Sequence, residues 1–164
     1  MTSSGRFRLA ICGVLLLAYL AIVLAVTMWP TPLDQGYAAA IERVLGVLHR
    51  HGVPEWFGYN DLEFTANIAM FLPLGFLLAL TFSRRLWWLS LLLIPALSAA
   101  IEGVQGRFLA ERFASALDVI ANTIGGYLGV LIAQALRALV HGRDLFVVAE
   151  ALEEGRGADP QQNS

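Results

Sequence analysis

The sequence has no lysine and only one cysteine, and each of these shortages excludes a class of chemistry. All 11 basic residues are arginines. The chain therefore has no lysine for a pyridoxal Schiff base, a phosphate-binding loop or a serine–lysine dyad. The single cysteine, Cys12, excludes a disulfide framework within the chain and a metal site built from several thiolates.

Charged residues are scarce as well. They make up 15% of the 164 residues, whereas 57% are hydrophobic. Soluble domains have about 25% charged and 45–50% apolar residues, and a soluble core cannot hide this much apolar surface. The net charge of −2 offers no basic surface for nucleic acid. The composition predicts a membrane protein that does not bind DNA or RNA.

Long apolar runs predict four membrane spans. They cover residues 9–29, 64–82, 89–101 and 117–136. The first run, as a helix rising 1.5 Å per residue, would cross a hydrocarbon core of about 30 Å. We therefore expect an all-α, polytopic membrane protein with four transmembrane helices.

A shorter helix is expected in the loop between the first two spans. Ile41, Val44, Leu45 and Leu48 recur at the i, i+3, i+4 and i+7 spacing of an amphipathic helix. Its apolar face would either rest on the membrane surface or cap the helix bundle. Trp56 and Tyr59, which follow it, are typical of the membrane–water interface.

The arginines predict the orientation of the chain. With four spans, six arginines near the spans lie on the side of the termini and four lie on the opposite side. Those on the side of the termini are Arg6, Arg8, Arg84, Arg85, Arg137 and Arg143. Those on the opposite side are Arg43, Arg50, Arg107 and Arg112. Because the side richer in arginine is usually cytoplasmic, we expect both termini in the cytoplasm. We also expect residues 1–141 to form the membrane domain and residues 142–164 a cytoplasmic, partly disordered tail.

Polar residues interrupt the spans at their outer ends. They are Asn67, Glu102, Gln105, Asp118 and Asn122, with Arg112 in the loop between the last two spans. An ionisable side chain in a span costs about 2.5–3.5 kcal/mol, so such groups usually face a bundle interior or a wet cavity. These six residues either line an outward-facing, ligand-binding pocket or pair across helices and hold the bundle together.

Other residue patterns give narrower expectations. No span contains a histidine, so the chain has no candidate residues for a histidine-dependent phosphatase or a zinc protease inside the membrane. Outside the enzyme hypothesis given below, we expect neither a metal site nor a bound cofactor. Gly125 and Gly129 have the spacing that lets two helices approach closely, either inside the bundle or between copies in a homo-oligomer.

Two motifs resemble the VanZ-like family of small bacterial membrane proteins. The first is the run NIAMFLPLGF at residues 67–76; the second comprises Glu102-x-x-Gln105, Arg112 and Asp118-x-x-x-Asn122-Thr123-x-Gly125. The resemblance covers residues 9–140. It implies a protein of the cell envelope, and the family's namesake is associated with resistance to the glycopeptide antibiotic teicoplanin.

Three functions follow as hypotheses. The six polar residues bind the headgroup of a lipid or of a lipid-linked cell-wall precursor and contribute to glycopeptide tolerance. Alternatively, Glu102 and Asp118 act as an acid–base pair or as metal ligands in an enzyme that modifies a lipid-linked substrate. In the third hypothesis the chain is a structural helix bundle, in which the same residues only pair with one another.

Overall fold

The computed structural model describes residues 3–28, 38–108 and 115–157, and these residues form five α-helices and no strand. The helices are α1 (Ser3–Thr27), α2 (Ala38–Arg50), α3 (Tyr59–Thr81), α4 (Leu89–Phe108) and α5 (Ala116–Gly157). The predicted all-α fold is confirmed. The amphipathic helix expected around residues 41–48 is α2.

Four of the helices are long and apolar enough to cross a membrane. The candidate spans are Leu9–Thr27, Tyr59–Thr81, Leu89–Phe108 and Ala116–Arg143. Large apolar side chains on their outer faces, among them Leu17 and Leu131, are exposed, as lipid-facing surfaces are in a protein of this class. The four predicted spans are therefore confirmed.

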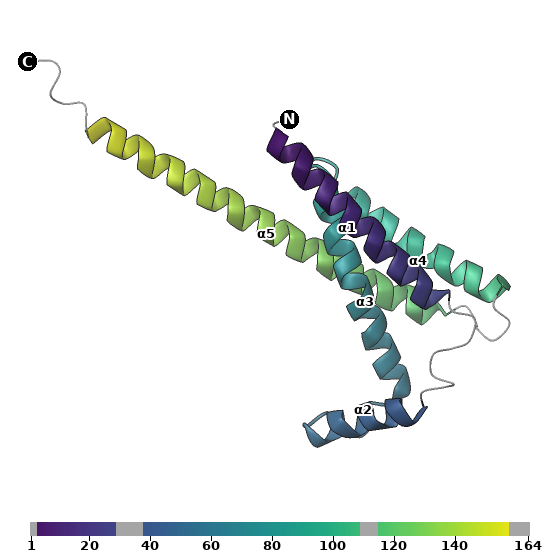
Figure 1. The fold of residues 1–164 in the computed structure, drawn as a ribbon. Helices are drawn as coiled ribbons and strands as arrows, with labels where there is room; N and C mark the ends of the chain where they lie inside the picture. The colour runs from purple at the N-terminus through teal and green to yellow at the C-terminus, as the bar shows by residue number, and fades with distance from the viewer. Residues whose placement is uncertain (1–2, 29–37, 109–114, 158–164) are drawn as a thin grey trace, which may run out of the picture.

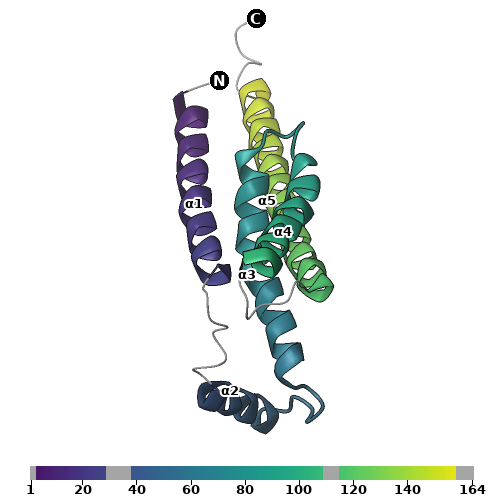
Figure 2. The same cartoon turned by 90° about the vertical axis from the view of Figure 1, so that its right-hand side faces the viewer.

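The four spans pack side by side, with α3 and α5 in the closest association (Figures 1 and 2). α4 packs on α5, and α1 packs on α3. The core is small and lies where these helices meet, around Phe71, Leu74, Ile94 and Val130. α3 extends beyond the bundle at one end, where α2 lies across its start; we call this the α2 end.

Glycines allow the backbones of α3 and α5 to meet. A Cβ atom on Gly75 would overlap the backbone of Gly126, and one on Gly125 or Gly129 would overlap the backbone of Ile68 or Leu72. Small residues in this arrangement are typical of tightly packed membrane helices. The homo-oligomer expected through Gly125 and Gly129 stays a prediction, although α3 of the same chain covers both glycines here.

Two tyrosines bind backbone carbonyls beside the prolines inside α3 and α4. Pro95 has no N–H, so it leaves the carbonyl of Leu91 without its helical partner. The hydroxyl of Tyr127 in α5 donates to that carbonyl, at 2.8 Å. The hydroxyl of Tyr19 in α1 donates to the carbonyl of Met70, at 2.9 Å, next to the carbonyl that Pro73 leaves without a partner.

The helices extend further than their apolar runs. α3 begins at Tyr59 rather than at residue 64, and its start is stabilised by the Asp61 carboxylate, which accepts a hydrogen bond from the N–H of Gly58 at 3.0 Å. α4 continues from residue 101 to Phe108. α5 continues beyond residue 141 to Gly157 without a break, so one helix joins the predicted membrane domain to its predicted tail.

Candidate functional site

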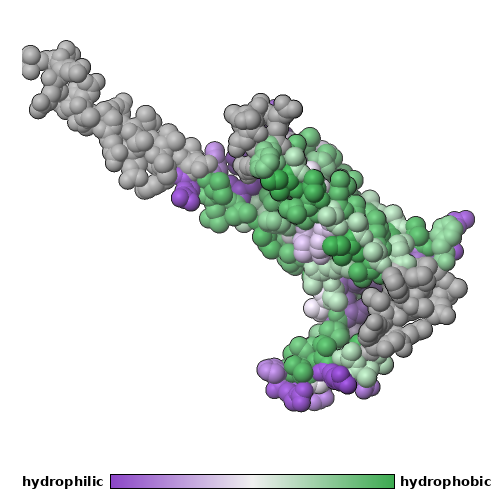
Figure 3. All heavy atoms as spheres, in the orientation of Figure 1, coloured by the Kyte–Doolittle hydropathy of each residue, from purple (hydrophilic) through white to green (hydrophobic). Residues whose placement is uncertain are grey.

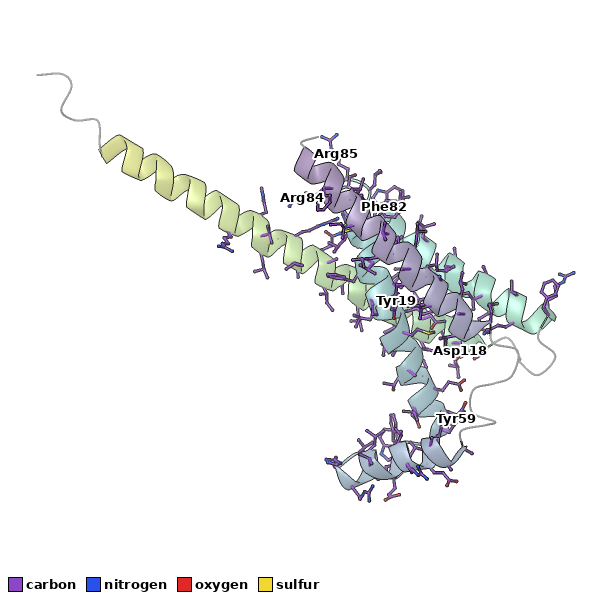
Figure 4. All side chains as sticks on the ribbon, viewed as in Figure 1. Tyr19, Tyr59, Phe82, Arg84, Arg85 and Asp118 are labelled. Atoms are coloured by element: carbon purple, nitrogen blue, oxygen red, sulfur yellow. The ribbon has the colours of Figure 1, made fainter. Side chains whose placement is uncertain are left out.

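The predicted polar residues of the spans gather at the α2 end of the bundle, where α1 and α4 end and α5 begins. Figure 4 labels Asp118 at this level, beside the end of α1. The members that the structure describes are Asn67 of α3, Glu102 and Gln105 of α4, and Asp118 and Asn122 of α5. We call these five residues the polar cluster. The sixth predicted site residue, Arg112, lies outside the described residues.

Asn67 and Asp118 connect α3 to α5. The Nδ2 atom of Asn67 donates to Oδ1 of Asp118 at 3.0 Å, and both side chains are half-buried. Asp118 lies in the first turn of α5, where the free N–H groups of a helix favour a negative charge. The backbone N–H of Asp118 donates to the hydroxyl of Ser115 at 3.3 Å, so Ser115 satisfies one N–H group at the start of the helix that carries this carboxylate.

Asn122 lies one turn further along α5 and connects it to α4. Its Nδ2 atom donates to the hydroxyl of Ser98 at 3.0 Å. Asn122 is only 3% exposed, and its Oδ1 atom has no hydrogen-bond partner among the described residues. A buried amide oxygen without a partner is rare and costly, so Asn122 offers one free acceptor inside the bundle.

Glu102 brings a second carboxylate to the start of α5. Its Oε2 atom accepts a hydrogen bond from the N–H of Ser115 at 2.8 Å, and the residue is 6% exposed. Ser115 directly precedes α5, so this bond satisfies one of the N–H groups that a helix start leaves without an internal partner. The arrangement allows a carboxylate to be buried where the helix dipole is positive.

Gln105 connects α4 to α1. Its Nε2 atom donates to the carbonyl oxygen of Thr27, the last residue of α1, at 2.6 Å, and both residues are buried. Together the five side chains of the polar cluster make contacts that reach all four spans. This is the pairing that the structural hypothesis expects. The carboxylate of Glu102 accepts a hydrogen bond from Ser115 at the start of α5, and that of Asp118 accepts one from Asn67 of α3.

Metal ligands are not gathered in the part of the chain that the structure describes. No three His, Cys, Asp or Glu side chains there lie close enough together to hold a metal ion. The polar cluster combines two carboxylates, which accept hydrogen bonds, with amide groups, which both donate and accept them.

The comparison with known families agrees with the motifs in these helices. Residues 16–137 match the family model described as VanZ/LLP1. The chain belongs to the VanZ/LLP1 family. No curated protein and no solved structure shows a significant match to it.

The part of the chain that matches the VanZ/LLP1 family includes the complete candidate site. It contains the five residues of the polar cluster together with Arg112. It ends at Arg137, whose guanidinium donates to backbone carbonyls at the end of α3. The family match thus covers all of α3 and α4 and the part of α5 that packs on them up to Arg137.

Three residues that contact the polar cluster were missed from the sequence. Ser98 is four residues before Glu102, a spacing that places both on one helix face. Ser115 and Asp118 have the Ser-x-x-Asp spacing seen at helix starts, which indicates the hydroxyl bond of Ser115. Thr27 contributes only its backbone oxygen to Gln105, and no sequence pattern indicates such a contact.

Proposed function

We propose that this VanZ/LLP1 family protein binds the polar headgroup of a membrane lipid or of a lipid-linked cell-wall precursor at the polar cluster, and thereby contributes to glycopeptide tolerance. The observation that carries the proposal is the burial of Glu102, a carboxylate, at the same end of the bundle as Asp118 and Asn122. Carboxylates within a membrane span are costly, and packing alone does not need them.

Each polar residue has a role in the proposed site. Arg112 precedes Ser115 by three residues in the sequence, and its guanidinium would bind a phosphate or carboxylate with two parallel hydrogen bonds. Glu102 and Asp118 would orient Arg112 or accept hydrogen bonds from ligand hydroxyls. The free Oδ1 atom of Asn122 would accept a further hydrogen bond, while Asn67 and Gln105 hold the helices that carry the site.

A structural role is the second candidate, because one observation favours it. All five members of the polar cluster form hydrogen bonds, and these bonds link neighbouring helices or the start of α5. If this were their complete role, substitutions would lower the stability of the bundle in proportion to the bonds lost. They would have no separate effect on ligand binding or on antibiotic tolerance.

Antibiotic tolerance tests the proposal. We expect the chain to raise the minimum inhibitory concentration of teicoplanin in a susceptible bacterial host. Arg112→Ala and Glu102→Gln, at wild-type levels in the membrane, should return it to the value of the empty vector. The matched control is Arg107→Ala, because Arg107 is an exposed arginine of α4 at the same end. Full tolerance in both site variants would contradict the proposal.

A binding measurement separates the two candidates. The purified protein is placed in lipid nanodiscs, and native mass spectrometry counts the lipid molecules that remain bound to it. The wild type is compared with Glu102→Gln and with the control Arg107→Ala. The proposal expects Glu102→Gln to lose bound lipid, with a melting temperature in detergent close to that of the wild type. A lower melting temperature with unchanged bound lipid would indicate the structural role instead.

A further inference from the structure

α2 is an amphipathic helix with part of its apolar face uncovered. Ile41, Leu45 and Leu48 are half-buried. Val44 and Val47, on the adjoining part of the face, are 46% and 45% exposed. Trp56, shortly after the helix, is 75% exposed. Val44 and Val47 lie three residues apart and so share one helix face, and exposed apolar residues grouped on a surface indicate an interaction site.

The apolar side of α2 faces the membrane-spanning bundle. Figure 3 shows the hydrophobic atoms of α2 on its side toward the bundle and hydrophilic atoms on its far side. α2 also runs across the direction of the spans (Figures 1 and 2). A helix in the plane of a bilayer, with its apolar side toward the acyl chains, has this arrangement.

The length of α3 places α2 at the surface of the bilayer. α3 has 23 residues and is therefore about 34 Å long, slightly more than the hydrocarbon thickness of about 30 Å. Its last residue is close in sequence to the exposed Arg84 and Arg85, which belong in a headgroup layer. The first turn of α3, with Asp61, then reaches the opposite headgroup layer, and α2 is joined to that turn.

A hydrogen bond fixes α2 relative to α3. The Nε2 atom of His49, near the end of α2, lies 3.0 Å from the carbonyl oxygen of Phe57 and donates to it. Residues 51–58 between the two helices are thereby closed into a compact connection. Because this connection restrains α2 beside the start of α3, the orientation of its apolar face is a property of the fold.

The charge of α2 indicates whether electrostatic attraction or apolar burial would hold the helix at the bilayer surface. The helix carries one carboxylate, Glu42, and two guanidinium groups, Arg43 and Arg50. Segments that recognise anionic lipid by charge have clusters of 4–8 basic residues. Burial of apolar side chains is therefore the main driving force, and a neutral lipid surface is sufficient.

We infer that α2 lies on the leaflet surface at the α2 end of the bundle, with Val44, Val47 and Trp56 inserted between the lipid headgroups and the upper acyl chains. This site is separate from the polar cluster and does not depend on the function proposed for it. The partner is the bilayer itself, and a zwitterionic phosphatidylcholine surface is sufficient.

Fluorescence quenching tests this position. Because the chain has a single cysteine, a Cys12→Ala background allows one environment-sensitive dye to be attached at Val44→Cys, Val47→Cys or the control Glu42→Cys. Glu42 is exposed and lies two residues from Val44 on a different helix face. The labelled full chain is placed in phosphatidylcholine nanodiscs, with iodide as the aqueous quencher and a lipid carrying a nitroxide on its upper acyl chain as the membrane quencher.

The expected result is opposite quenching on the two faces of α2. Labels at residues 44 and 47 should be quenched by the nitroxide lipid and several-fold less by iodide than the label at residue 42, with or without added anionic lipid. Equal access of iodide to all three labels would overturn the inference, because α2 would then stand in water. Protection of residues 44 and 47 from both quenchers would also overturn it, because protein would then cover the face. A requirement for anionic lipid would overturn the apolar driving force.

Discussion

At the scale of single residues, Arg137 stabilises the end of α3 from another helix. Its Nη2 atom donates to the carbonyl oxygens of Ala79 and Phe82, both at 2.8 Å, and to that of Leu80 at 3.1 Å. The last carbonyls of a helix have no partner within it and form the negative end of its dipole. A guanidinium at this place therefore satisfies hydrogen bonds and the local charge together.

We predict that Arg137→Ala destabilises the bundle. Hydrogen bonds from a charged group contribute about 1.5–3 kcal/mol, and the free energy of unfolding in detergent should fall by about that amount. Arg143→Ala is the matched control, because Arg143 is an exposed arginine of the same helix. Thermal or SDS unfolding of the purified proteins measures both. Equal stability of the two variants would show that the contacts of Arg137 contribute little.

The sequence indicates which polar residues of the spans are unusual, but it does not indicate which residues they contact. The spacing of Asp118 and Asn122 predicts a shared helix face, and the structure shows both meeting neighbouring helices from the start of α5. The contact between Asn122 and Ser98 of α4 depends on the register between α4 and α5. No local sequence pattern specifies that register. For the same reason the sequence places Arg137 only among the arginines on the side of the termini and does not indicate its contacts with α3.

At the scale of elements, the close packing of α3 against α5 depends on glycine. A Cβ atom on Gly75 would overlap the backbone of Gly126 in α5, and backbone atoms move only if the helix moves. A Cβ atom on Gly103 in α4 would meet nothing within 4 Å. A glycine-to-alanine substitution therefore causes a steric conflict at residue 75 and none at residue 103.

We predict that Gly75→Ala separates α3 from α5 and lowers stability. Overpacking costs about 1–3 kcal/mol, whereas Gly103→Ala should be neutral or stabilise α4, because alanine is favoured over glycine in a helix by about 1 kcal/mol. The readouts are the melting temperature in detergent and the fraction of monodisperse protein in size-exclusion chromatography. An unchanged Gly75→Ala variant would mean that the backbones do not approach as closely as the structure shows.

The sequence predicts the four spans more accurately than it predicts the residues at which the helices begin and end. Uninterrupted apolar runs indicate spans directly, since the bilayer sets their length. The polarity of Glu102 and Gln105 predicts that the third span ends at residue 101, yet α4 continues past both residues to Phe108. Their side chains bond to Ser115 and Thr27, and these tertiary contacts let polar residues remain inside a helix.

At the scale of the whole molecule, exposed arginines mark one end of the bundle. Figure 4 shows Phe82, Arg84 and Arg85 near the start of α1, and Tyr59 at the opposite end. Arg84, Arg85 and Arg143 are exposed, as expected of residues outside the hydrocarbon. The proposed function requires the other end, with the polar cluster, to face the cell exterior, where glycopeptides act on cell-wall precursors.

We predict that the loop before α3 is external and the loop before α4 is cytoplasmic, because more arginines flank the spans on the latter side. In the Cys12→Ala background, His51→Cys should react with a membrane-impermeant maleimide in intact cells, whereas Ser83→Cys should react only after lysis. His51 and Ser83 are both exposed, so a difference between them reports the side of the membrane. The cysteine-free chain is the control for background labelling. The reverse labelling pattern would place the polar cluster at the cytoplasmic surface, where it meets lipid headgroups but no external antibiotic. That result would be compatible with headgroup binding, but it would exclude a direct role in glycopeptide tolerance.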